Sequence, residues 1–237
     1  MRGVLLRAGF GQIRLRAFLA VSALLVATAC ASGQPPPAAG TSAGPAAPAN
    51  AVDAPWLDRR RTFTLTPDAS KATFRVQEQF LGVKLPEDAV GSTKALIGKI
   101  TLTAEPAIVA EESFFEVETK SLRTDISMRD NAIKVSLRAY QVAKARFVPR
   151  EVRGLPAVRS DDGAFKAQLV GEMSIREVTQ PVTFDVDGFL RGNDLGGTAR
   201  AELKMSDYGI DQPRAMDVAW VADQVRLEIE FAASGAD

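Results

Sequence analysis

Residues 182–190 read Val-Thr-Phe-Asp-Val-Asp-Gly-Phe-Leu, and this stretch decides the fold class. Its first six residues alternate between apolar and polar side chains without a break. The same alternation returns at residues 224–232, which read Gln-Val-Arg-Leu-Glu-Ile-Glu-Phe-Ala. Successive side chains of a β-strand point to opposite faces of the sheet, so each stretch predicts a strand with one buried face and one solvated face.

Six more segments have the composition of strands: 61–66, 72–80, 95–104, 113–119, 165–175 and 198–205. Residues 129–140 suit a short helix about as well as a strand, and we assign a helix there, between strands four and five. Asp125 and Ser127 are its candidate N-caps. About eight strands with one buried face predict an all-β closed barrel or a sandwich, and closure removes exposed strand edges.

The amino-terminal residues have the composition of a secretion signal. Residues 1–16 contain four arginines and no acid, and residues 17–27 are apolar except for Ser22. A helix that crosses a bilayer needs about 20 apolar residues, so we favour a cleaved signal peptide over residues 1–29 to an uncleaved anchor. Adjacent arginines are absent, which favours the general secretion route over twin-arginine export.

The next segment, residues 30–55, is dominated by Ala, Pro, Gly, Ser and Thr. Few large apolar side chains are present to offset the entropy of ordering, so we expect a disordered linker. One folded domain then spans residues 56–237.

Cys30 is the only cysteine in the chain, so an intrachain disulfide is impossible. Ala27-Thr28-Ala29-Cys30 follows the apolar run and resembles a bacterial lipobox, which implies cleavage before Cys30 and lipid attachment to its thiol. The same small residues also suit the ordinary signal peptidase, which would leave a soluble periplasmic protein. The linker favours the lipoprotein, because a tethered domain needs a spacer. Ala31 follows the cysteine, at the position where an aspartate marks inner-membrane retention of lipoproteins in some Gram-negative bacteria. We therefore expect attachment to the outer membrane.

The residue inventory argues against most catalytic classes. The chain contains no histidine, which excludes Ser-His-Asp and Cys-His catalysis and histidine metal sites. Without residues 1–29 it has 25 basic and 29 acidic residues, so its net charge of −4 gives no global attraction to nucleic acid or to anionic membranes. The acidic pairs Glu111-Glu112 and Asp161-Asp162 are best explained as solvated surface. We therefore expect no enzyme, no catalytic residue, no metal and no cofactor; a lipid-modifying enzyme is the least supported hypothesis.

Short motifs in a fixed order then carry a resemblance. They are Gly91-x-Thr93, Gly98-x-Ile100, Ser121-Leu122-x-Thr124, Arg129-Asp130 with Ile133, Ala145-x-Phe147, Gly171-x-Met173-Ser174-Ile175, Val178-Thr179-x-Pro181-Val182, Asp207-Tyr208-Gly209-Ile210 and Asp223-x-Val225-x-Leu227-x-Ile229. The chain resembles the YceI-like family, bacterial lipocalin-like barrels that bind polyisoprenoid lipids. The resemblance implies an antiparallel eight-stranded lipocalin-like barrel without catalytic groups. The chain departs from the family at Glu177, where a glycine is usual, and at Ala143, where a proline is usual.

We expect six apolar side chains to line the barrel interior and to contact a ligand: Phe74, Val76, Leu169, Met173, Phe184 and Val186. Such an interior suits an isoprenoid or another long-chain lipid, because each buried methylene contributes about 0.8 kcal/mol. The protein would store, shield or transport that lipid in the cell envelope, with membrane attachment through a lipid on Cys30. The alternative is a structural or interaction module whose barrel is filled by side chains. The sequence does not specify an oligomeric state.

Overall fold

The computed structural model describes residues 56–156, 162–213 and 218–236. The signal peptide expected at residues 1–29, the linker expected at 30–55 and the lipidation site expected at Cys30 lie outside the described residues. They remain predictions.

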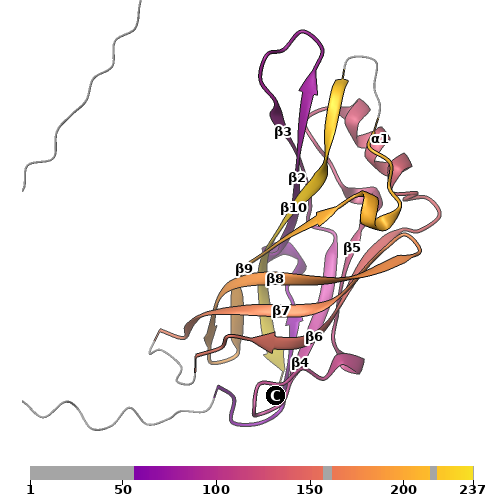
Figure 1. The fold of residues 1–237 in the computed structure, drawn as a ribbon. Helices are drawn as coiled ribbons and strands as arrows, with labels where there is room; N and C mark the ends of the chain where they lie inside the picture. Colours follow the sequence, from indigo (N-terminus) through magenta and orange to yellow (C-terminus); the bar gives the residue numbers. More distant parts are fainter. Residues whose placement is uncertain (1–55, 157–161, 214–217, 237) are drawn as a thin grey trace, which may run out of the picture. The chain divides into compact units, whose positions relative to one another are not determined.

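The described chain forms one antiparallel sheet of ten strands (Figure 1). In chain order the strands are β1 (Arg61–Leu65), β2 (Lys71–Phe80), β3 (Glu87–Thr93), β4 (Leu96–Leu102), β5 (Phe114–Glu118), β6 (Lys144–Arg153), β7 (Ala164–Ile175), β8 (Val178–Arg191), β9 (Asp194–Lys204) and β10 (Val218–Ala236). Four short 3-10 turns accompany them: η1 (Pro67–Ala69), η2 (Ala110–Glu112), η3 (Thr119–Ser121) and η4 (Ser206–Tyr208).

The sheet closes on itself through β10, which is 19 residues long. Its first part pairs with β2, from Val218 opposite Phe80 to Glu230 opposite Lys71. Its last part pairs with β1, and its other edge pairs with β9. Closure pairs both edges of β10 from Val225 to Glu230, which removes exposed strand edges there.

Two pairs of strands continue one another, so the ten strands make an eight-stranded barrel. Strands β1 and β2 are interrupted only by η1, and β3 and β4 only by Lys94 and Ala95. β1 pairs with β4, and β2 pairs with β3. At the interruption, Ser70 Oγ accepts a hydrogen bond from Ala232 N at 3.1 Å, which holds the break against β10. The predicted all-β eight-stranded barrel is confirmed.

The structure adds β3 and β6 to the strands predicted from composition and alternation, although the resemblance already implied a strand at Ala145-x-Phe147, within β6. The segments predicted at 61–66 and 72–80 form one interrupted strand. The sequence of β6 does not predict a strand, because Pro149 lies in its middle and proline has no backbone N–H to donate to a neighbouring strand. The pairing of β6 with β7 is irregular between Pro149 and Glu151, as a bulge would produce. In β3, Glu87 and Asp88 precede the apolar positions, and acidic residues are depleted in strands.

The predicted helix is α1 (Ser127–Ser136), which follows β5 and precedes β6. It starts and ends earlier than the expected range. The expectation that Asp125 or Ser127 caps it was wrong, because its N-cap is Ile126 and no side chain makes a cap hydrogen bond. Asp125 forms an ion pair with Arg129 instead, and Ser127 is already helical.

The β7–β8 hairpin turns through two residues, Arg176 and Glu177. Arg176 takes the positive φ of 58° that tight hairpins use, whereas Glu177 has no positive φ. Glu177 therefore does not need the backbone freedom of a glycine in this turn.

Apolar side chains inside the barrel form two clusters. One contains Trp56, Phe63 and Leu96, and the other contains Phe147, Phe184 and Tyr208. The two ends of the barrel are distinct: β1 starts and β10 ends at the lower end in Figure 1, while the β2–β3 hairpin and α1 lie at the upper end. In the described ranges, no helix has the length and apolar character to cross a bilayer.

Candidate functional site

A cavity of about 360 Å³ lies inside the barrel. Small-molecule sites in proteins range from about 300 to 1,000 Å³, so the cavity has room for a ligand. The structure places all six predicted interior residues in its wall: Phe74, Val76, Leu169, Met173, Phe184 and Val186. That they contact a ligand stays a prediction.

The wall is almost entirely apolar. Its polar side chains are Thr73, Glu78, Thr119, Arg129, Ser136 and Gln168. Phe147 and Phe184 both line the cavity and pack edge to face, with ring centroids 5.0 Å apart. An apolar cavity of this kind favours a long hydrocarbon chain and offers few groups that could orient a polar substrate.

Trp56 and Leu57, the first described residues, close the lower end of the cavity. The Trp56 ring stands edge-on to Phe165, with ring centroids 5.5 Å apart, and its indole N–H donates to the Pro156 carbonyl at 2.9 Å. This closure brings together residues 100 positions apart in the chain. Trp56 is not recognisable as a site residue from the sequence, because no residue near it in the chain indicates its partners Phe165 and Pro156.

Helix α1 supplies one side of the wall. The residues that it contributes are Arg129, Ala132, Ile133 and Ser136, followed by Leu137 just after the helix. These positions recur at intervals of three and four, the spacing of one helix face. The opposite face includes Val135, which is exposed. The helix therefore separates the cavity from solvent.

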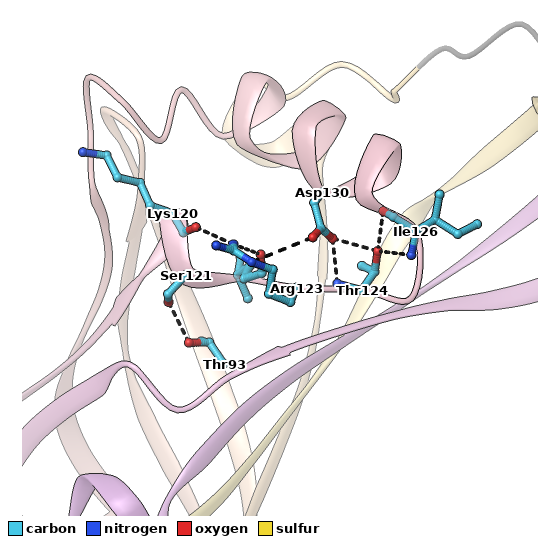
Figure 2. Close-up of polar contacts among 8 residues, drawn as sticks. Thr93, Lys120, Ser121, Arg123, Thr124, Ile126 and Asp130 are labelled. Atoms are coloured by element: carbon cyan, nitrogen blue, oxygen red, sulfur yellow. Dashed lines mark hydrogen bonds and ion pairs between the residues drawn. The ribbon is translucent and has the colours of Figure 1, made fainter.

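Asp130 fixes α1 against the barrel (Figure 2). Its buried carboxylate accepts hydrogen bonds from Thr124 N at 2.6 Å and from Thr124 Oγ1 at 2.8 Å. Arg123 Nε lies 4.0 Å from the same carboxylate, and Arg123 N donates to the Ser92 carbonyl on β3. The segment before the helix is thus attached both to α1 and to a strand.

A second link joins α1 to β2. Arg129 forms ion pairs with Glu78 and with Asp125, and both the Arg129 and Glu78 side chains are largely buried. Two carboxylates therefore neutralise the guanidinium, so this end of the cavity presents no free cation. Glu78 was missed at the sequence level, although a signal existed: in residues 72–80 it follows Phe74 and Val76 at the same alternate spacing and so points inward.

The motif at residues 207–210 packs beside the cavity. Asp223 accepts hydrogen bonds from Ser206 Oγ at 2.6 Å and from Ser206 N at 2.8 Å, and these bonds lower the pKa of its carboxyl. The two hydrogen bonds join η4 to β10, and Tyr208 at the end of η4 is buried. Burial, with a smaller contribution from the charge of Asp207, raises the pKa of the Tyr208 phenol to about 12.

The cavity carries little reactive chemistry. Glu78 and Arg129 are the charged members of its wall, and they pair with each other. Within residues 56–156, 162–213 and 218–236, no three carboxylate, histidine or cysteine side chains cluster as metal ligands. The arrangement is suited to holding an apolar molecule.

A family model described as the YceI-like domain matches residues 63–233, most of the barrel. The chain belongs to the YceI-like family. A UPF0312 protein of Pseudomonas fluorescens is 30% identical to this YceI-like chain over 151 residues, which cover 60% of this chain and 72% of that protein.

Two solved structures share the fold of this YceI-like domain. BcnA of Burkholderia cenocepacia has a TM-score of 0.55 at 17% identity, over 72% of this chain and 99% of BcnA. A polyisoprenoid binding domain from Saccharophagus degradans, implicated in plant cell wall breakdown, has a TM-score of 0.53 at 12% identity, over 73% of this chain and 98% of that domain. At these identities the likeness concerns the fold alone.

Proposed function

We propose that this YceI-like domain binds an isoprenoid or a similar amphiphilic lipid, with the hydrocarbon chain inside the barrel and without converting it chemically. The observation that carries the proposal is the apolar cavity of about 360 Å³. Burial there contributes about 0.8 kcal/mol per methylene, so a prenyl chain gains affinity without strong polar contacts. The polyisoprenoid binding domain from Saccharophagus degradans, which shares the fold, supports this ligand class.

The same cavity disfavours the alternative of a structural module with a filled barrel. Side chains of such a module would occupy the interior at the density of a protein core, in which voids larger than a water molecule are rare. Because Glu78 and Asp125 neutralise Arg129, the cavity offers the polar end of a ligand no unpaired guanidinium.

The test begins with protein purified from its native host. Organic extraction and mass spectrometry are expected to recover a prenyl lipid in a reproducible amount. Recovery of an empty protein that also fails to bind prenyl lipids in solution would overturn the proposal.

A pair of variants locates the binding. Ala199→Phe adds a ring to the cavity wall and is expected to abolish binding of a fluorescent geranylgeranyl probe. Thr183→Phe adds the same ring to the exposed face of neighbouring β8 and is expected to leave binding unchanged. Circular dichroism and thermal unfolding confirm that both variants fold. Equal binding by the two folded variants would place the ligand outside the barrel.

Envelope attachment is a separate part of the proposal. The export signal, the linker and Cys30 support a lipoprotein that is tethered to the outer membrane and stores, shields or transports its ligand. Intact mass spectrometry of the membrane fraction is expected to show cleavage before Cys30 and an added lipid. Cys30→Ser is expected to carry no added lipid. A mature chain that carries an unmodified cysteine would show ordinary signal cleavage instead.

A further inference from the structure

The upper end of the barrel exposes large apolar side chains. Leu81, Val83 and Leu85 occupy the β2–β3 hairpin tip and are 63%, 49% and 75% exposed, and Trp220 on β10 is 42% exposed. We call these four residues the rim. Figure 1 shows the hairpin and the first part of β10 projecting together beyond the barrel. Exposed apolar groups gathered in this way mark an interaction surface.

Hydrogen bonds make the rim one surface. The Trp220 indole N–H donates to Gln79 Oε1 at 2.9 Å, and Gln79 Nε2 donates to the Val83 carbonyl at 2.9 Å. Gln79 therefore connects the β10 side of the rim to the hairpin tip. Gly82 lies between two rim residues with a φ of 80°, which lets the tip turn tightly.

The rim borders one end of the cavity wall. Glu78 and Val221 line the cavity, and their sequence neighbours Gln79 and Trp220 lie on the outer faces of the same two strands. The rim therefore lies just outside the wall at this end of the barrel.

We propose that the rim docks on a lipid bilayer and that lipid enters and leaves the cavity there. This inference rests on the proposed function and names the surface that serves it. The composition favours a bilayer: leucines can enter the acyl region, tryptophan prefers the membrane interface, and Lys84 is the single charged residue from Phe80 to Pro86. Its long stem can extend the ammonium group to lipid phosphates while the leucines stay buried.

The two tryptophans of the chain provide the readout. The full chain carrying Cys30→Ser, which cannot be lipidated, is mixed with phosphatidylcholine vesicles whose acyl chains are brominated. Bromine quenches tryptophan on contact. Quenching of Trp220 is expected, and it is expected to vanish in W220F, whose remaining Trp56 is buried at the other end. Unquenched fluorescence, or quenching that persists in W220F, would overturn the proposal.

Matched variants test the hairpin. L81S/L85S is expected to weaken vesicle binding about tenfold or more, because several methylenes no longer enter the bilayer. Ile97→Ser removes an apolar side chain of β4 that is 48% exposed and lies outside the rim, and it is expected to bind vesicles like the parent. Equal binding by L81S/L85S and I97S would overturn the proposal and leave the rim as a surface for protein partners.

The same variants separate docking from ligand binding. The geranylgeranyl probe, supplied in detergent, bypasses the membrane and is expected to bind L81S/L85S as it binds the parent. A parent chain that binds the probe but does not dock on vesicles would overturn the proposed docking of the rim and leave the proposed function intact. If the chain docks on vesicles but never binds the probe, the result would support docking of the rim on a bilayer and overturn the proposed function.

Discussion

The ring of Phe74 on β2 lies directly over Gly91, its cross-strand partner on β3. A Cβ atom at residue 91 would lie 2.2 Å from Cε1 of the ring, so no larger residue fits there without moving Phe74. The glycine thus lets an aromatic ring lie flat against the wall and leaves the space beyond it open.

Gly91→Ala is expected to push the Phe74 ring into the cavity. Overpacking of this kind costs about 1–3 kcal/mol of stability. The displaced ring removes room for about two methylenes, so prenyl-lipid affinity falls roughly tenfold. Urea unfolding and probe titration measure the two effects. The double variant F74V/G91A removes the clash and is expected to recover affinity; if it binds as weakly as G91A, ring displacement is not the cause.

Asp130→Ala is expected to lower the free energy of unfolding by about 1–3 kcal/mol, because Thr124 N and Oγ1 lose their acceptor. Local detachment of α1 would also open one side of the cavity, so the bound probe should dissociate faster. Glu177→Gln is the control, since its ion pair with Arg138 is exposed and such pairs contribute about 0–1 kcal/mol. Urea unfolding checks the difference, and equal losses in both variants would contradict this role of Asp130.

The ion pair of Arg129 with Glu78 predicts a strongly asymmetric response to mutation. Glu78→Met leaves a largely buried guanidinium short of one partner, and breaking a buried pair costs about 3–5 kcal/mol. E78M/R129M removes both charges and is expected to recover most of that stability. Chemical unfolding of the two single variants and the double variant forms the cycle. Additive losses would show that the two side chains do not depend on each other.

Tyr208 predicts a loss of stability in strongly basic solution. Its pKa in the folded protein is raised to about 12, while an unfolded tyrosine ionises near 10. The stability that this difference contributes is present below pH 10 and is lost as pH rises towards 12, by about 1.4 kcal/mol per pH unit. Tyr208→Phe removes the ionisation, so unfolding measured against pH should be flatter in that variant. Parallel curves would exclude Tyr208 as the cause.

Trp56→Ala is expected to cost about 3–5 kcal/mol, because a buried indole leaves the lower end of the barrel. Trp56→Phe retains an aromatic contact with Phe165 and loses the hydrogen bond to Pro156, so its loss should be smaller. Thermal unfolding ranks the two variants. Similar melting temperatures for the parent and Trp56→Ala would show that the barrel end does not need this closure.

Sequence alone determined the character of the barrel. Alternation at 182–190 and 224–232 is a local property of the chain, and it correctly assigned side chains such as Phe184 and Val186 to the interior. The local sequence of β6 argues against a strand, because Pro149 lies in its middle. The irregular pairing that accommodates this proline forms only against β7, so it is not visible in the sequence of β6 alone. The closure by Trp56, the pairing of Arg129 with Glu78 and the space left by Gly91 were decided only by tertiary structure. Each depends on residues far apart in the chain, whose contact is set by strand register and packing.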